Sequence, residues 1–229
     1  MKISAKTISQ IYYQILRIRK IELEISKEYT EWKMRCPVHL SIGQEGIAAP
    51  LSILFKNKKY EVLSSHRAHA HYLSKGGNLF ELISEIMGKS TGCSGGRGGS
   101  MHLTDEKSGF LLSTAIVANS IPVAAGVALS KKIKKEKGLV LAFFGDGAIE
   151  QGVFYETINF SIIKNLPIIF ICENNKYSVY SKMEVRQPKN RKIHKMVEKI
   201  GIKSLFSNGL DSVEIYQKFL YAKNYVEKK

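Results

Sequence analysis

Residues 143–178 read FFGDGAIEQGVFYETINFSIIKNLPIIFICENNKYS. The continuous apolar run GLVLAFF leads into it, and a second run, LPIIFIC, follows the helical pattern of IEQGVFYETINFSIIKN. A strand, a helix and a strand in about 35 residues predict a right-handed crossover unit of a parallel sheet. We therefore expect an α/β fold in which helices cover both faces of a parallel sheet.

Oxygen-bearing side chains follow both predicted strands. Asp146 stands between Gly145 and Gly147 after the first strand, and Asn174 and Asn175 follow the second. Parallel strands place their carboxyl ends at one edge of the sheet, where open α/β sheets bind ligands, so these side chains should converge. A carboxylate and an amide oxygen suit Mg²⁺, whose shell is normally completed by backbone carbonyl, water and phosphate oxygens. The two strand ends therefore predict a magnesium site that also holds a diphosphate.

The same residues have a plainer interpretation. An aspartate between glycines is common in turns, and a pair of asparagines after a strand is common in loops. Each feature alone is weak, but 26 residues separate Gly147 from Asn174, and a strand precedes each motif, so the combination is more specific. The glycines would let the backbone approach a phosphate, and the helix after Gly147 would direct its positive N-terminal end toward it.

The rest of the chain supplies further helices and strands. Apolar residues three or four positions apart predict helices over residues 7–28, 78–88, 118–136, 190–200 and 211–229. We expect strands at 60–64 and near 202–206, and a short helix in 41–55 that is interrupted or begins around Pro50.

The segment KSTGCSGGRGGSMHL, residues 89–103, is too rich in glycine for regular structure. Five glycines fall in the eight positions 92–99, and each costs backbone entropy to order. A flexible linker between domains is one interpretation. Because apolar sequence resumes directly after it, we favour a functional loop within one domain.

Composition limits the remaining classes of function. With 229 residues and 44% apolar content, the chain can bury a substantial core, and we find neither an apolar run of 18 residues nor a secretory signal. A cytoplasmic protein is therefore expected. The three cysteines are far apart and predict neither a disulfide framework nor a zinc site.

The formal net charge of +15 raises the possibility of an anionic partner. Basic residues concentrate in 131–137 and 182–203, without interleaved aromatic residues or a nucleic-acid motif. We interpret them first as solvated faces, second as a surface for an acidic partner or anionic substrate, and third as a nucleic-acid site.

GDGAIEQG followed by ICENN resembles the thiamine-diphosphate motif of the 2-oxo acid dehydrogenase first components, in the form found in the alpha chains of pyruvate and acetoin dehydrogenases. Further blocks resemble that family in the same order: HLSIGQEG (39–46), SHRAHAHYLSKGG (65–77), GCSGGRGGSMHL (92–103) and IVANSIPVAAGVAL (116–129). The likeness runs from Cys36 to about Tyr225, and the spelling HRAHAH is closer to the acetoin branch.

The resemblance implies a thiamine-diphosphate-binding fold and a set of site residues. Mg²⁺ would be held by the side chains of Asp146 and Asn175 and the carbonyl of Tyr177. The other residues implied to bind the cofactor are, for the diphosphate, His66, Arg67, Gly145, Gly147 and Ala148, and, for the aminopyrimidine ring, Ala115 and Val117. His69 matches a family histidine near the reacting carbon and is the candidate proton shuttle, since an unperturbed imidazole titrates near neutrality.

The resemblance also implies partners. A beta subunit would supply the glutamate that activates thiamine, and a lipoyl-bearing acyltransferase would receive the acyl group. Pyruvate, acetoin and a branched 2-oxo acid all remain open as substrates, because the beta chain builds part of the pocket.

We expect a single domain over residues 1–229 with an N-terminal helical extension over about 1–40. We expect it to lack the family's C-terminal part, including a further strand and a YRxxGHS segment, and to expose a sheet edge as a result. Three hypotheses follow: an alpha subunit that works with a beta subunit, a non-catalytic remnant that keeps the fold, and, more distantly, a basic nucleic-acid-binding module.

Overall fold

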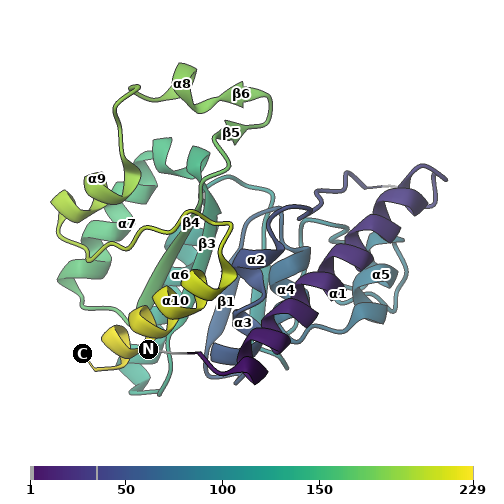
Figure 1. Cartoon of the computed structure of the whole chain (residues 1–229), viewed down its shortest axis with the longest axis horizontal. Coiled ribbons are helices and arrows are strands. Elements are labelled where there is room, and N and C mark those ends of the chain that lie inside the picture. The colour runs from purple at the N-terminus through teal and green to yellow at the C-terminus, as the bar shows by residue number, and fades with distance from the viewer. Residues whose placement is uncertain (1–2, 35, 229) are drawn as a thin grey trace.

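The computed structural model describes residues 3–34 and 36–228 (Figure 1). Its centre is a parallel sheet in the order β2-β1-β3-β4. The strands are β1 (Glu61–Ser64), β2 (Phe110–Ser113), β3 (Val140–Gly145) and β4 (Ile168–Glu173). The predicted crossover unit is confirmed: β3 leads through α7 (Gly152–Ile163) into β4, and all six residues of β3 pair with β4.

Helices cover both faces of the sheet, as the α/β prediction requires, because successive side chains of a strand point to opposite faces. Leu141 and Phe143 of β3 pack in the same cluster as side chains of α1, α3, α4, α5 and α10, whereas Val140 and Ala142 pack against α6. The bounds are α1 (Ala5–Tyr29), α3 (Leu51–Leu54), α4 (His69–Lys75), α5 (Leu79–Ile86), α6 (Ser120–Lys134) and α10 (Ser212–Glu227).

Helix α1 is part of the main core. Ile11, Ile18 and Ile25 recur every seven residues and are buried, and Ile18 and Ile25 lie in the same apolar cluster as the sheet. Ser4 caps the helix by accepting a hydrogen bond from the backbone N–H of Thr7. The predicted helix over 7–28 is therefore confirmed within a few residues.

The interruption expected around Pro50 is also confirmed. Helix α2 (Glu45–Ala48) ends just before Pro50, and α3 begins just after it. Proline fits the start of a helix because its missing N–H would have no intrahelical partner there.

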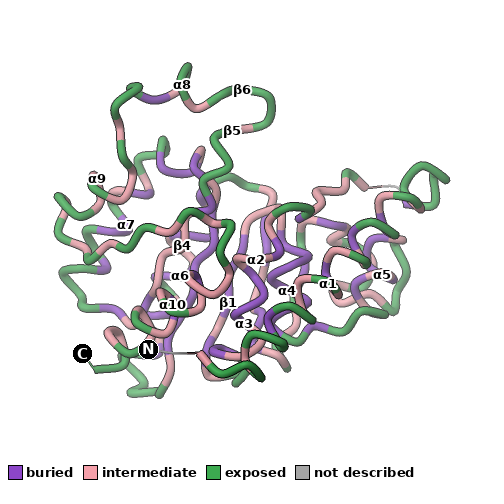
Figure 2. The backbone as a smooth tube through the Cα atoms, in the orientation of Figure 1, coloured by how far each residue is buried: buried purple, intermediate pink, exposed green. Residues whose placement is uncertain are grey.

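A β-hairpin and a short helix project from the carboxyl edge of the sheet (Figure 1). The hairpin pairs β5 (Tyr177–Ser178) with β6 (Ser181–Lys182), and α8 (Met183–Arg186) follows directly. Most of this segment is exposed, in contrast to the buried central strands (Figure 2).

The prediction of a strand near residues 202–206 is wrong. Helix α9 (Ile193–Ile200) ends at Gly201 in a left-handed conformation, and residues 202–207 have no regular structure. They line a groove of about 1020 Å³ beside β4 instead of pairing with it. An apolar pattern becomes a strand only where a neighbouring backbone offers a hydrogen-bond ladder.

That groove leaves β4 as an edge strand of the described sheet, with its middle residues only half-buried. Side chains of α7, α9 and α10 complete its walls. No helix in the described part of the chain is long and apolar enough to cross a membrane.

Candidate functional site

The predicted cofactor and metal residues follow the carboxyl ends of the four strands. Strand β1 lies between β2 and β3, so the chain leaves β1 toward β2 and later returns to the other side. Open α/β sheets bind ligands in the crevice at such a reversal. His66 and Arg67 follow β1, Ala115 and Val117 follow β2, and the two predicted metal segments follow β3 and β4.

Asp146 is the most buried of these residues. It begins the 3₁₀ helix η1 (Asp146–Glu150) and its exposed fraction is 0%. Its Oδ2 accepts a hydrogen bond of 2.7 Å from Nη2 of Arg186, and the same guanidinium contacts Glu150. Oδ1 of Asp146 is buried and finds no hydrogen-bond donor in the part of the chain that the structure describes. A buried carboxylate is costly unless it is paired, and in this structure Arg186 is the cation that pairs with Asp146.

The donor set at Asp146 therefore fits a divalent cation. One carboxylate oxygen already binds a cationic group, and the other has free lone pairs in a buried position. Gly145 pairs with Glu173 in the sheet, so Asp146 and the pair Asn174–Asn175 follow directly at neighbouring strand tips. Hard oxygen ligands from two adjacent loops are what Mg²⁺ takes in proteins.

The asparagine pair is exposed and shaped by local turns. Oδ1 of Asn174 accepts from the N–H of Lys176 at 3.0 Å, and Oδ1 of Asn175 accepts from the N–H of Tyr177 at 2.9 Å. Asparagine is common in such turns, so these contacts agree with the interpretation of the pair as loop residues. Each amide oxygen retains a second lone pair, so the turn at Asn175 does not exclude a metal ligand.

Gly147 lies against the projecting hairpin. A Cβ placed on Gly147 would come within 2.8 Å of Oγ of Ser178, so a side chain there would push the two loops apart. Gly145 has open space around it, and Ala148 is buried. Gly147 is thus required by the close approach of the protein's own hairpin at Ser178.

His66 and Arg67 follow β1, which pairs with β3 on the side away from β4. Burial first, and then the neighbouring His39 and Arg67, lower the pKa of His66 to about 4. The His39 ring lies edge-on to it, with 4.8 Å between ring centroids, and Nη1 of Arg67 donates to the carbonyl of Leu40. At neutral pH His66 is therefore a neutral hydrogen-bonding group beside the Arg67 guanidinium.

The residues after β2 present apolar surface. Val117 is 52% exposed, its neighbour Ile116 is 66% exposed, and Ala115 is half-buried. Ala118 next to them has a φ of 67°, in the left-handed region that residues other than glycine seldom adopt. A flat, partly apolar ring could rest on such a surface.

His69 lies in the core and not in the open crevice. Its exposed fraction is 0%, Nδ1 lies 3.3 Å from Oε2 of Glu22, and Nε2 lies 2.8 Å from Oγ of Ser100. Carboxylate, histidine and serine in this order resemble a nucleophilic triad, but Glu22 and Ser100 are also fully buried. In this structure Ser100 is closed off from substrate, and the proton-shuttle role of His69 stays a prediction.

A second histidine of α4 was missed by the sequence analysis. His71 stacks on Phe143, and its two ring nitrogens lie 2.8 Å from Oγ of Ser64 and 3.2 Å from Oε1 of Glu173. The alternating histidines in HRAHAH were a signal that could have drawn attention to it. His71 links the end of β1 to the end of β4.

The glycine-rich loop also has an unexpected partner. The fully buried carboxylate of Glu85, on α5, accepts hydrogen bonds from backbone N–H groups of the loop. The loop is therefore ordered within the domain, as the sequence analysis favoured.

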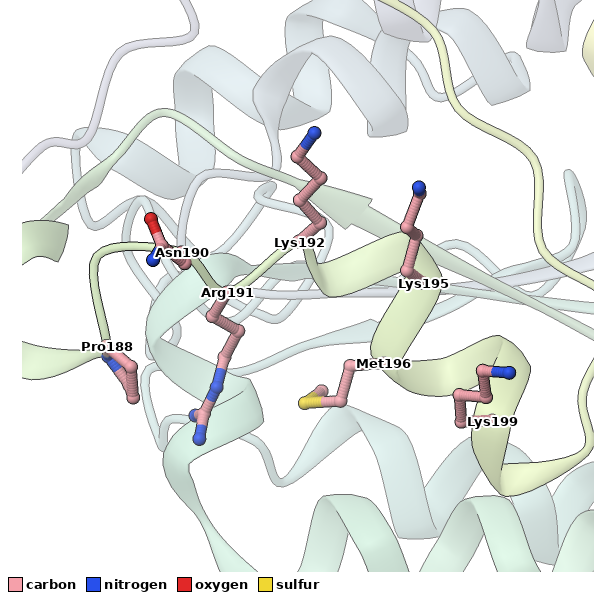
Figure 3. A pocket seen from close by; sticks show the side chains of 7 residues that line it. All are labelled: Pro188, Asn190, Arg191, Lys192, Lys195, Met196 and Lys199. Carbon is pink, nitrogen blue, oxygen red and sulfur yellow. The ribbon is translucent and has the colours of Figure 1, made fainter.

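The basic stretch 182–203 surrounds a separate shallow hollow of about 460 Å³ on α9 (Figure 3). Arg191, Lys192, Lys195 and Lys199 line it. Figure 3 shows Arg191 pointing in the opposite direction from Lys192 and Lys195, so the cations do not converge on one point. Exposed, divergent lysines favour the solvated-face interpretation.

Comparison with known proteins gives consistent matches. The profile of the family described as dehydrogenase E1 component matches residues 13–229. Pyruvate dehydrogenase E1 component subunit alpha of Rickettsia bellii is 34% identical over 215 residues, covering 94% of this chain and 65% of the relative. The protein of the same name from Porphyra purpurea is 36% identical over 214 residues, covering 90% and 62%.

A mitochondrial relative from Arabidopsis thaliana, pyruvate dehydrogenase E1 component subunit alpha-1, is 32% identical over 227 residues, covering 99% of this chain and 57% of the relative. The chain thus spans 57–65% of the length of these three relatives.

Proposed function

Because the chain belongs to the dehydrogenase E1 component family, we propose that it is an alpha chain that binds thiamine diphosphate and Mg²⁺ and acts with a beta chain. Its substrate would be a 2-oxo acid, with pyruvate favoured by the names of the relatives and acetoin by the HRAHAH spelling. A lipoyl-bearing acyltransferase would accept the acyl group.

The observation that carries this proposal is the buried carboxylate of Asp146 at the tip of β3, the strand that pairs with the one that precedes Asn175. It has one oxygen without a donor and the other bound to a cation within the described chain. Burial without full compensation is costly in a folded protein, which is why such a group points to a ligand.

Named residues of this chain would hold the cofactor. Asp146, Asn175 and the carbonyl of Tyr177 would ligate Mg²⁺, and Arg67 would offer its planar guanidinium to the diphosphate oxygens. When bound, thiamine supplies a carbanion nucleophile and accepts the electrons released by decarboxylation. The remaining cofactor residues would act on the two ends of the molecule: His66, Gly145, Gly147 and Ala148 at the diphosphate, Ala115 and Val117 at the aminopyrimidine ring.

His69 would hold or move a proton at Nε2. Its Nδ1 faces the Glu22 carboxylate, which favours the tautomer with its proton on Nδ1 and Nε2 as an acceptor. In this structure Nε2 faces Ser100. Proton exchange with substrate therefore requires a rearrangement around Ser100, for which docking of the beta chain is the candidate.

Calorimetric titration of the full chain with thiamine diphosphate and Mg²⁺ tests the proposal. The wild type should bind both together, and Asp146→Ala should abolish the magnesium-dependent part because this carboxylate provides the main protein charge on the metal. Retained affinity in the variant would contradict the site assignment.

Repeating the titration and a turnover assay with a beta chain distinguishes the three hypotheses. Binding with turnover supports the working alpha subunit. Binding without turnover favours a remnant that keeps fold and cofactor site. No cofactor binding together with tight nucleic-acid binding favours the basic module.

A further inference from the structure

The carboxylate of Glu85 is enclosed by the glycine-rich loop. Oε2 accepts from the N–H groups of Ser94 (2.7 Å) and Gly96 (2.9 Å), and Oε1 accepts from those of Gly98 (2.6 Å) and Gly99 (3.1 Å). Glu85 is 0% exposed, and no salt bridge to it occurs among the described residues. Its charge is therefore compensated by backbone dipoles alone, an arrangement known as an anion nest.

The glycines are required by this enclosure. Gly96 has a φ of 76°, and a Cβ there would lie 2.6 Å from the carbonyl oxygen of Lys89. A Cβ on Gly98 would overlap the carbonyl of His102, and one on Gly92 would overlap Glu85 itself. Glycine is thus the residue that lets the backbone close around the carboxylate.

The loop passes directly from this nest to His69. Gly98 and Gly99 are the two residues before Ser100, and a Cβ on Gly99 would lie 2.8 Å from Cβ of Cys36. Ser100 has little freedom as a result. Its Oγ accepts from the backbone N–H of His39 at 3.2 Å and lies 2.8 Å from Nε2 of His69.

We propose that Glu85 is a positioning residue for His69. The Glu85 carboxylate holds residues 92–100 of the glycine-rich loop in place, and this part of the loop ends at Ser100, which contacts His69. The proposal rests on the proposed function only in assigning a catalytic purpose to His69. The physical step is independent of it: the Ser100 hydroxyl, held by the loop, donates to Nε2, while Glu22 accepts from Nδ1–H, and together they fix the tautomer and the ring orientation.

The test uses Glu85→Gln in the full chain, labelled with ¹⁵N-histidine. Glutamine keeps the shape but turns one acceptor oxygen into an NH₂ donor, so half of the nest loses its acceptor. Backbone amides of the loop should exchange hydrogen about tenfold faster or more, as expected for lost hydrogen bonds to a charged group. The His69 ring-nitrogen signals should shift toward a mixture of tautomers.

Glu81→Gln is the matched control. Glu81 lies one turn earlier on α5, and in the described structure the loop N–H groups that donate to a carboxylate donate to Glu85 and not to Glu81. Loop exchange and His69 signals should stay as in the wild type. Equal changes in both variants would overturn the proposal, since they would report a general effect of charge on α5.

Ser100→Ala keeps the test decisive if Glu85→Gln does not fold. It should shift the His69 signals while the amides of Gly98 and Gly99 keep their wild-type exchange. Unchanged His69 signals in either folded variant would overturn the proposal. Because none of these readouts needs thiamine diphosphate, they remain valid if the chain fails to bind cofactor, and that outcome would count against the proposed function alone.

Discussion

Arg186 binds the carboxylate of Asp146 across 40 positions of sequence, and Glu22 reaches His69 across 47. Such partners could not be predicted, because only the tertiary fold brings them together. The positions of Asp146 and Asn175 at neighbouring strand tips could be predicted, since the end of a strand fixes the place of the residues next to it. Local sequence therefore supplied the proposed ligands but not the groups that compensate or orient them.

The two asparagines provide a matched pair for the magnesium site. Each closes a similar turn with the N–H two residues on, so replacement by alanine should disturb the loop equally. Asn175→Ala should weaken magnesium-dependent thiamine diphosphate binding about tenfold or more, because a metal ligand is lost, whereas Asn174→Ala should have little effect. Calorimetric titration measures both, and equal losses would indicate that Asn175 acts only through the turn.

His66 should make the folded state sensitive to acid. Its pKa falls from 6.5 to about 4 on folding, chiefly through burial, so between these values the unfolded chain binds a proton that the folded chain does not. Stability should therefore decrease as the pH falls from 6.5 toward 4. Urea unfolding at several pH values should show a shallower decrease for His66→Gln, and identical slopes would contradict the neutral state of His66.

At the scale of elements, long periodic helices and the two six-residue strands β3 and β4 were predicted well. Strand β2 was missed because four residues following a glycine-rich loop give no distinct period. The β5–β6 hairpin was missed for the same reason, with two residues on each side. This hairpin and α8 nevertheless position Arg186 so that its guanidinium binds the carboxylate of Asp146.

The segment from β5 to α8 should respond to Mg²⁺, because Arg186 occupies an oxygen of the proposed metal ligand. Arg186→Met removes the competing cation and leaves Asp146 buried without it, so Mg²⁺ should bind about tenfold more tightly than to wild type. Magnesium titrations followed by thermal unfolding would show this as a larger stabilisation at low metal concentration.

Arg191→Met provides the control for that experiment. Arg191 lies five residues further on, lines the shallow hollow on α9, and is not a partner of Asp146 in the described chain. Its variant should bind Mg²⁺ like the wild type. Weaker binding by Arg186→Met would mean that Arg186 supports the metal site and does not compete with it.

For the whole molecule, α1 and α10 show that the ends of the described chain belong to the core. Ile18 and Phe219 lie in the same apolar cluster although about 200 residues separate them. The sequence predicts both helices but not that they pack in one apolar cluster. Periodicity identifies an apolar face without identifying what covers it.

The contribution of α1 to stability can be measured with two variants of one helix. Ile18 is 0% exposed and Leu23 is 52% exposed. Ile18→Ala should lower the free energy of unfolding by about 2–5 kcal/mol through lost burial and a cavity, whereas Leu23→Ala should change it by about 0.5 kcal/mol or less. Denaturant unfolding checks this, and equal small effects would show that α1 is detachable.

His69 and His71 lie on nearly opposite sides of the short helix α4, since alternate residues of a helix are about 200° apart. One ring is held by Glu22 and Ser100, and the other by Ser64 and Glu173, the residue just before the asparagine pair. The rotation of α4 about its own axis is thereby fixed twice. A rotation of α4 that shortened the hydrogen bonds of one imidazole would lengthen those of the other. A displacement at the tip of β4 would therefore move α4 as a rigid body and shift the His69 ring on its far side.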